Sequence, residues 1–324
     1  MNKSVAIIAG EPNSISSEII FKSWKLKNKF RHKFLFIIGS IKLLNLQKNK
    51  LKYHFKIKKI EKNFNIKDLT SNKLPVYNVN YKQKKPFQKI TSNSNKYIFE
   101  CFDVALELIK NKKILGIVNC PVSKETLFKK KYQGVTELLS KKTKSKNNEV
   151  MLIFNKKLSV APLTTHISIS QVKSKLKKQK IINKIKVIDS FYKKNLNKRP
   201  KIAVLGLNPH NFSTSKKSEE KKIIIPAIKI IKKKGIKITG PISTDTSFML
   251  FNEKNFDIII GMYHDQVLTP FKALFKYNAI NITLGLPYIR ISPDHGVAED
   301  IVGKKISNPT SLIESIKFFN NINN

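Results

Sequence analysis

Three histidines stand in short polar segments, and each segment directly follows an apolar run of the chain. They are His166 after residues 158–164, His210 after residues 202–207, and His264 after residues 256–261. Such runs predict buried strands, and the carboxyl ends of parallel strands lie along one edge of a sheet. Three neutral imidazoles there would hold a divalent ion and leave positions open for substrate oxygens. We therefore predict a metal site, although a single histidine is more commonly an ordinary surface or core residue.

Other side chains close to predicted strand ends carry complementary chemistry. Asp265 follows His264 directly and can orient its imidazole without binding the metal itself. Arg290, one of three arginines, stands in an apolar run and suits bidentate capture of a carboxylate or phosphate, with a structural ion pair as the alternative. Ser123 lies between a strand and a helix, where it can receive an anion or simply cap the helix.

The elements that must position these residues follow from the hydrophobic pattern. Near-continuous apolar runs predict strands at residues 5–9, 34–39, 114–119, 150–154, 158–164, 202–207, 256–261 and 279–284. Helical patterns cover residues 98–110, 168–194, 218–234 and 308–319. This alternation predicts an α/β fold with a mostly parallel sheet. Residues 41–95 show weak periodicity and predict a peripheral strand or two and loops, and the glycine-rich Rossmann fingerprint is absent from the sequence.

The composition is strongly basic, with 63 Lys and Arg residues against 21 Asp and Glu. Such a charge can indicate nucleic-acid binding. However, the lysines are spread along the chain together with many Asn and Ile residues, which is typical of drift in base composition, so we expect no specific nucleic-acid partner. No apolar run reaches the length of about 18 residues that a membrane span requires, and the first run is too short for a signal peptide. We therefore expect a cytoplasmic protein with no membrane partner.

Short motifs in a fixed order resemble the 4-hydroxythreonine-4-phosphate dehydrogenase family of pyridoxal phosphate biosynthesis. The most specific are Tyr263-His264-Asp265-Gln266 and Leu284-Gly285-Leu286-Pro287. The others lie at residues 10–12, 121–124, 134–137, 164–166, 206–210, 245–246, 288–290 and 294–296. The resemblance extends from about residue 5 to residue 305 and is strongest in the second half of the chain.

The resemblance implies a two-lobed fold like that of isocitrate and isopropylmalate dehydrogenases, with a mostly parallel sheet and a cleft between the lobes. The first lobe, on the cofactor side, would comprise residues 1–130 and 276–324. The second, which carries the metal and the dimer interface, would comprise residues 131–275. The resemblance also implies a homodimer in which His166 and His210 bind the metal together with His264 donated across the interface.

The resemblance assigns further residues to substrate, cofactor and catalysis. Substrate-binding positions are Thr136, Lys272, Asn281 and Arg290. Positions beside NAD or NADP are Leu284, Gly285, His295 and Gly296. Lys272 and Asp265 are the candidate catalytic residues, and a lysine or a metal-bound water remain alternatives for the general base. Imidazole ligands favour Zn²⁺ or Co²⁺, and substrate oxygens in the open positions would also suit Mg²⁺.

The activity that the resemblance implies is NAD(P)-dependent oxidation of 4-phosphooxy-L-threonine at its C3 hydroxyl. Metal-assisted decarboxylation would then give 3-amino-2-oxopropyl phosphate. One substrate position departs from the family, because Val135 stands where the family has a histidine. The alternative is therefore a paralogous dehydrogenase that acts on another phosphorylated hydroxy acid, a phosphothreonate or a phosphoerythronate.

Overall fold

The computed structural model describes residues 4–29, 34–128, 132, 134–143, 145, 149–212 and 217–322, which group into two units. Unit 1 comprises residues up to Leu138 together with Tyr288–Asn321, and unit 2 comprises Leu139–Pro287 with Ile322. This division differs from the expected lobes at Ile322 and in two short segments. Residues 131–138 group with unit 1, and residues 276–287 group with unit 2, because strand β11 (Ile280–Leu284) pairs with strand β6 (Val150–Phe154).

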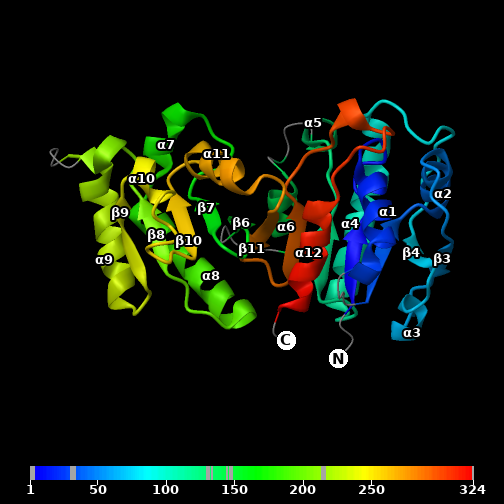
Figure 1. Ribbon diagram of the computed structural model, residues 1–324, viewed down its shortest axis with the longest axis horizontal. Coiled ribbons are helices and arrows are strands. Elements are labelled where there is room, and N and C mark those ends of the chain that lie inside the picture. The colour runs from blue at the N-terminus through cyan, green and yellow to red at the C-terminus, as the bar shows by residue number, and fades with distance from the viewer. Residues whose placement is uncertain are drawn as a thin grey trace. The chain divides into compact units, whose positions relative to one another are not determined.

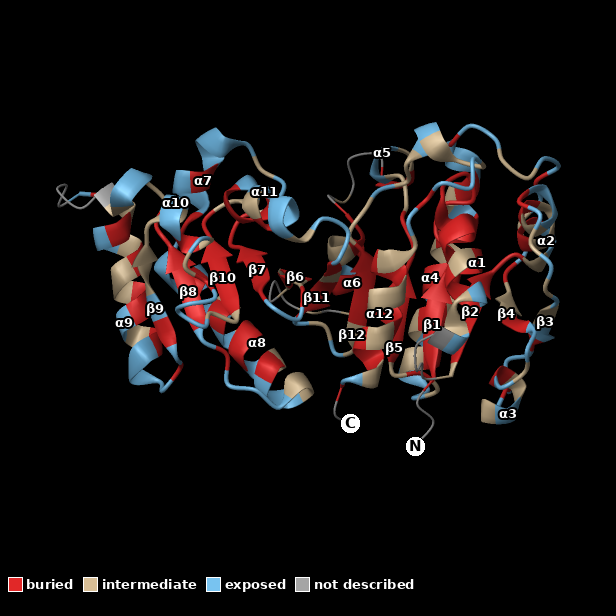
Figure 2. Ribbon diagram, in the orientation of Figure 1, coloured by how far each residue is buried: buried red, intermediate tan, exposed pale blue. Residues whose placement is uncertain are grey.

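The sheet of unit 1 is parallel throughout and has the strand order β3-β4-β2-β1-β5-β12, with β3 and β4 labelled in Figure 1 and all six strands labelled in Figure 2. Its strands are β1 (Val5–Ile8), β2 (Leu35–Gly39), β3 (Ile57–Ile60), β4 (Leu74–Asn78), β5 (Gly116–Asn119) and β12 (Ile289–Pro293). The strands β1, β2 and β5 are buried along their whole length (Figure 2). Their continuous apolar sequences are therefore explained by cover on both faces of the sheet.

The helices of unit 1 all bury apolar side chains. They are α1 (Ser16–Lys25), α2 (Ile41–Lys50), α3 (Ile66–Leu69), α4 (Asn95–Lys110), α5 (Lys124–Phe128), the first turn of α6 (Val135–Lys142), and α12 (Thr310–Asn320), with 3₁₀ turns at Lys27–Lys29, Ser92–Ser94 and Glu299–Ile301. In α4, Ile98, Phe102 and Ala105 recur at helical spacing and are fully buried, and the helix packs on β1 and β2. Helix α12 packs against β5, β12 and α1.

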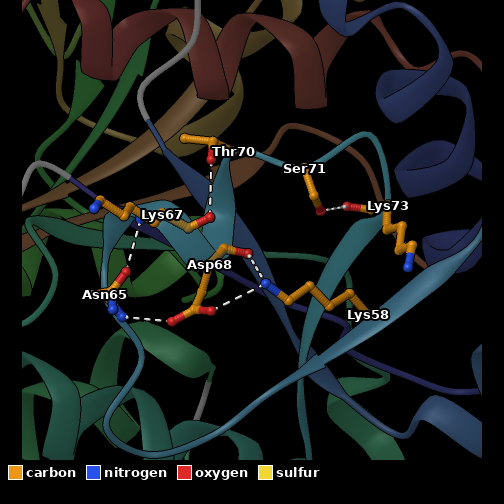
Figure 3. A network of polar contacts seen from close by, with 7 residues as sticks. All are labelled: Lys58, Asn65, Lys67, Asp68, Thr70, Ser71 and Lys73. Atoms are coloured by element: carbon orange, nitrogen blue, oxygen red, sulfur yellow. Dashed lines mark hydrogen bonds and ion pairs between the residues drawn. The ribbon is translucent and has the colours of Figure 1, made fainter.

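Residues 41–95 contain more regular structure than the sequence predicts. The expected peripheral strands are present as β3 and β4, but helices α2 and α3 also form there. Figure 3 shows how local hydrogen bonds fix α3: the Asn65 side chain accepts from the Lys67 amide at 2.9 Å, and Asp68 accepts from the Asn65 amide at 3.0 Å. Lys58 of β3 binds the Asp68 carboxylate at 3.1 Å. This capping box stabilises a single helical turn that hydrophobic periodicity cannot reveal.

The sheet of unit 2 has the order β11-β6-β7-β10-β8-β9. Its remaining strands are β7 (Ser159–Pro162), β8 (Ile202–Leu205), β9 (Ile238–Ile242) and β10 (Ile258–Gly261). The pairs from β7 to β9 are parallel, whereas β6 is antiparallel to both β7 and β11. The predicted α/β fold with a mostly parallel sheet is confirmed. Strands β9 and β12 were not predicted.

Helices of unit 2 are α7 (Ile169–Lys175), α8 (Lys178–Leu196), α9 (Ile225–Lys233), α10 (Thr244–Ser247) and α11 (His264–Phe275), with a 3₁₀ segment at Pro209–Phe212 and a π-helical turn at Glu220–Ile224. The core lies where α11 packs against the sheet, with Val267 and Phe271 of the helix in one cluster with Val160 and Ile259 of the strands. Within the described part of the chain, no helix is long and apolar enough to cross a membrane.

Gly10 brings the carboxyl ends of β1 and β5 together. Its φ is +74°, and a Cβ atom there would lie 2.5 Å from the carbonyl oxygen of Pro121. The next amide, of Glu11, donates to the same carbonyl at 2.9 Å. A side chain at position 10 would therefore force the two loops apart.

We predict that Gly10→Ala destabilises the protein more than Gly235→Ala does. Gly235 has the same φ of +74°, but among the described residues nothing lies within 4 Å of its Cβ position. Left-handed backbone alone should lower the free energy of unfolding by about 1–2 kcal/mol in Gly235→Ala, and the clash adds to this cost only in Gly10→Ala. Urea titrations followed by circular dichroism measure the free energy of unfolding of both variants. Equal losses would show that the loops accommodate a side chain at position 10.

Candidate functional site

Neighbouring parallel strands of unit 2 lead directly to the three histidines. The order β7-β10-β8 places the segments of His166, His264 and His210 next to one another at the carboxyl ends of the strands. Leu163 continues the pairing beyond β7, because its amide donates to the carbonyl oxygen of Gly261 at 2.8 Å. The three segments therefore share one edge of the sheet, where parallel α/β proteins commonly bind ligands.

The structure brings two of the three imidazoles together. The ring centroids of His166 and His264 lie 5.9 Å apart, with an angle of 39° between the ring planes. Nδ1 of His264 lies 2.6 Å from Oδ1 of Asp265. When that nitrogen donates its proton to the carboxylate, the lone pair of Nε2 is free to bind a metal. Asp265 therefore lies beside the His264 ring, and its orienting role stays a prediction.

His210 is oriented differently from the other two. Its backbone has φ 47°, and that of Asn211 has φ 59°, so two consecutive residues other than glycine adopt the left-handed region. The His210 side chain is 83% exposed, and its Nδ1 lies 3.8 Å from Oδ2 of Asp245. Among the described residues, no group of three or more His, Cys, Asp or Glu side chains is close enough to hold a metal ion. The metal site with His166, His210 and His264 thus stays a prediction.

Buried polar side chains connect the loops that carry the histidines. The Gln266 side chain accepts from the Met262 amide at 2.6 Å and donates to the Gly206 carbonyl at 2.7 Å and to Oγ1 of Thr244 at 2.9 Å. Oγ1 of Thr164 donates to the carbonyl oxygen of Met262 at 2.7 Å. These bonds join the chain beyond β7, β8, β9 and β10. Sequence analysis quoted Gln266 only as part of a motif and gave it no role.

A buried carboxylate holds the start of the His210 loop. Oε1 of Glu220 accepts from the amides of Leu207 and Asn208, at 2.8 and 2.9 Å. The Asn208 side chain also donates to Glu219 at 3.0 Å. Glu220 is 1% exposed although it lies in a lysine-rich segment. Nothing in the sequence distinguished this glutamate from a surface residue, because its partners are backbone amides brought close only by the fold.

In unit 1, the structure brings together the expected substrate residues Arg290 and Thr136. Nε of Arg290 donates to Oδ1 of Asn119 at 2.6 Å, and Nη1 lies 3.5 Å from Oγ1 of Thr136. Burial lowers the pKa of Arg290 to about 10, and the nearby Tyr288 opposes that change. Arg290 remains a cation at neutral pH, so a buried positive charge faces a hydroxyl group at the start of α6.

The other expected substrate residues, Lys272 and Asn281, belong to unit 2. Lys272 is exposed on α11. Asn281 lies in β11, and its Oδ1 is buried with no hydrogen-bond partner among the described residues. Buried amide oxygens are nearly always satisfied, so this atom is suited to receive a donor from a ligand. The substrate assignment of all four residues remains a proposal.

The expected cofactor residues are also divided between the units. In unit 1, His295 and Gly296 follow β12, and within the described residues nothing lies within 4 Å of the position of a Cβ on Gly296. This open space permits a close approach of a ligand to the backbone. In unit 2, the Leu284 side chain is buried at the end of β11, and Gly285 has φ +85°. The assignment of these four residues to the cofactor stays a prediction.

Comparison with known proteins identifies the family. The family model of the pyridoxal phosphate biosynthetic protein PdxA matches residues 31–319. The chain belongs to this family. Its resemblance to the family, first seen in the order of its motifs, is thereby confirmed.

Individual relatives are similar to this chain over nearly its whole length. A 4-hydroxythreonine-4-phosphate dehydrogenase of Sulfurihydrogenibium sp. (strain YO3AOP1) is 38% identical over 97% of this chain and 96% of its own length. A D-threonate 4-phosphate dehydrogenase of Salmonella typhimurium is 32% identical, covering 97% of both chains. The crystal structure of 4-hydroxythreonine-4-phosphate dehydrogenase from Klebsiella pneumoniae has a TM-score of 0.83 and 30% identity, covering 98% of both chains.

We predict that Gln266→Leu loosens the edge that carries the histidines. The change leaves the Met262 amide and the Gly206 carbonyl buried without their partner, so the free energy of unfolding should fall by about 2–4 kcal/mol. The control is Gln171→Leu, since Gln171 is exposed on α7 and this change should be nearly neutral. Urea titrations measure the free energy of unfolding of both variants. A loss within 0.5 kcal/mol of the control, roughly the scatter of surface substitutions, would contradict a structural role for Gln266.

Proposed function

We propose that the protein is an NAD(P)-dependent dehydrogenase that oxidises 4-phosphooxy-L-threonine at its C3 hydroxyl. The β-keto acid would lose CO₂ and give 3-amino-2-oxopropyl phosphate for pyridoxal 5′-phosphate biosynthesis. The observation that carries the proposal is the family match across almost the whole chain. The histidine edge of unit 2 and the buried cation of unit 1 support it, because the chemistry needs a metal and an anion-binding group.

In this proposal, His166, His210 and His264 hold one divalent ion, Zn²⁺, Co²⁺ or Mg²⁺. The pairing of the His166 and His264 rings supports the assignment, and His210 must turn from Asp245 to join them. A bound ion supplies Lewis-acid polarisation of the substrate oxygen, and NAD(P)⁺ accepts the hydride. Asp265 keeps the His264 ring oriented through its short hydrogen bond to Nδ1.

Substrate binding is assigned to Thr136, Lys272, Asn281 and Arg290. Arg290 and Thr136 would bind an anionic group of the substrate, and the unsatisfied Oδ1 of Asn281 would accept from a donor such as its ammonium group. The Lys272 ammonium would neutralise substrate charge, and it is our candidate for moving the proton of the C3 hydroxyl. Leu284, Gly285, His295 and Gly296 would line the nicotinamide cofactor. We place this reaction in the cytoplasm.

We further propose that the protein is a homodimer in which, as the family resemblance implies, His264 contributes to the site of the partner subunit. The 5.9 Å between the His166 and His264 rings of one chain favours the alternative, in which both rings serve the same subunit's site. Large apolar side chains are exposed in and beside the helices of unit 2 that follow β7, β9 and β10: Ile169 of α7, Met249 after α10, and Leu274 and Tyr277 at the end of α11. Exposed apolar residues concentrated on one set of elements are typical of an interface between protein chains. The surface on α7, α10 and α11 is our candidate interface.

Turnover tests the reaction and its metal together. The purified protein should reduce NAD⁺ or NADP⁺ with 4-phosphooxy-L-threonine, as followed by nicotinamide absorbance, and a chelator should abolish the rate. His166→Ala should lower kcat/KM on the order of a hundredfold or more, because it removes a proposed metal ligand. His54→Ala, in unit 1, is the control and should retain activity. Full activity after chelation would contradict the metal assignment.

A second candidate is a D-threonate 4-phosphate dehydrogenase. Val135 at the start of α6 is 6% exposed and stands where the family has a histidine, and the Salmonella typhimurium relative carries this alternative name. The same assay with D-threonate 4-phosphate decides between the two. A much larger kcat/KM for the sugar acid would reject the biosynthetic assignment and favour this activity.

Mixing two inactive variants tests the shared site. If His264 acts in the partner's site, a heterodimer of His166→Ala and His264→Ala subunits has one site with all three histidines intact. After co-refolding, the mixture should therefore recover about a quarter of wild-type activity, the statistical value for random pairing with one active site in each heterodimer. Each variant alone should stay inactive. If the mixture also stays inactive although heterodimers form, all three ligands come from one chain.

A further inference from the structure

We propose that Glu18 and Lys22 of α1 position the segment that carries His295 and Gly296, and that the affinity for the nicotinamide cofactor depends on them. This segment, residues 294–309, joins β12 to α12, and we call it the connecting segment. The positioning role rests on the proposed function, which assigns the cofactor to His295 and Gly296. It adds two residues that hold the connecting segment from α1.

The connecting segment has little regular structure of its own. Its one helical element in the described chain is the 3₁₀ turn Glu299–Ile301. Ala298 and Lys305 have φ angles of 48° and 64°, in the left-handed region that is unfavourable for residues with a Cβ atom. Such backbone persists only where the surrounding contacts hold it. The conformation of the connecting segment therefore depends on the elements beside it.

Lys22 holds the second half of the connecting segment. Its Nζ donates to the carbonyl oxygen of Lys305 at 2.8 Å and to that of Ser307 at 2.6 Å. It also lies 2.8 Å from Oε1 of Glu18, four residues earlier in α1. A lysine ammonium has three N–H donors, so these three oxygens can use all of them. The left-handed residue Lys305 is thus fixed by a charged donor.

Glu18 holds the same part of the connecting segment through its carboxylate. Its Oε1 accepts from the Ser307 amide at 2.9 Å as well as from the Lys22 ammonium. Ser307 is therefore bound at both its N–H and its C=O group. Glu18 is 1% exposed and Ser307 is 2% exposed, so water competes little for these bonds. Hydrogen bonds to charged groups are roughly twice as strong as those between neutral groups, which suits this contact to hold the segment.

The first half of the connecting segment is held by the same helix. The amide of Ile15, the residue before α1, donates to the carbonyl oxygen of Val297 at 3.2 Å. Ile15, Glu18 and Lys22 are spaced by three and four residues, so they lie along one side of the helix. Because Val297 directly follows Gly296, the position of α1 determines where the proposed cofactor residues lie.

A segment that is fixed in advance binds a nucleotide with a smaller loss of conformational entropy. The space at Gly296 is open, and a ligand that approaches the backbone there requires one conformation of the segment. Without the bonds from Glu18 and Lys22, the second half of the segment must be ordered when the nucleotide binds. This cost lowers the affinity for the cofactor. The proposed substrate residues lie outside the connecting segment, so substrate binding should change little.

Hydrogen exchange tests the contact directly. The double variant Glu18→Gln/Lys22→Met removes both charges, so neither is left buried without its partner. In the full-length protein, the amides of residues 295–307 should exchange about tenfold faster in this variant, whereas those of β1 and β5 should exchange at the wild-type rate. Lys22→Arg keeps the charge and the donors and should retain most of the protection. Lys25→Met is the control, because Lys25 is exposed on the same helix.

Nucleotide binding tests the consequence without turnover. NADH or NADPH, titrated by its fluorescence, should bind the double variant about five- to tenfold more weakly than it binds the wild type and Lys25→Met, and Lys22→Arg should retain most of the affinity. KM for 4-phosphooxy-L-threonine at saturating cofactor should stay within about twofold of wild type. A general loss of folded protein would lower kcat but leave the dissociation constant of the nucleotide unchanged, so the two effects are distinguished.

Two results would overturn the positioning role. One is wild-type exchange of the connecting segment in the double variant, and the other is faster exchange with an unchanged dissociation constant for the nucleotide. If the nucleotide binds the wild type and binds the double variant more weakly, but 4-phosphooxy-L-threonine is not oxidised, the proposed substrate is rejected and the positioning role stands. If the wild type binds neither nucleotide, the proposed cofactor and the positioning role are both rejected.

Discussion

The amide of Gln266 is the constraint on which the histidine edge depends. One side chain accepts from the chain beyond β10 and donates to the chain beyond β8 and β9, all within 2.9 Å. Beyond the strands, backbone hydrogen bonds join Thr164 to Met262 and Gly206 to Ile242, both at 3.1 Å, and the Gln266 side chain joins these two pairs to each other. Because Gln266 is buried, each of its bonds replaces contact with water and breaking one leaves a buried group unsatisfied. The loops therefore keep a common arrangement, and His264, two residues before Gln266, is held with them.

Rigidity is unevenly distributed among the three histidines. His264 begins α11 and has Asp265 beside its ring, whereas His210 lies in a left-handed segment and is largely exposed. Glu220 fixes the start of the His210 loop at Leu207 and Asn208, but it does not hold the imidazole itself. The edge of the sheet therefore carries two rings 5.9 Å apart and a third imidazole that is largely exposed.

The sequence predicted the elements whose apolar character follows from burial alone. The runs that became β1, β2, β5 and β10 are hydrophobic along their length because parallel strands are covered on both faces. Strand β12 escaped prediction because its buried positions include Arg290 and Ser292, which a hydrophobic pattern excludes. Strand β9 escaped because Gly240 and Pro241 interrupt it. The strand-end positions of the histidines could be predicted from the order of the apolar runs along the chain. The left-handed backbone of His210 could not be predicted, because it depends on tertiary contacts.

Lysine abundance shows why burial identifies functional charge better than composition does. The chain has a net charge of +42, so one further lysine carries no information in the sequence. An exposed lysine is hydrated and screened, and it interacts weakly with its neighbours. Lys124 differs because burial, and then the charge of Arg290, lower its pKa. Arg290 is itself buried and is held by the hydrogen bond from its Nε to Asn119. Burial therefore distinguishes these two cations from the hydrated charges of the surface, which the sequence alone could not do.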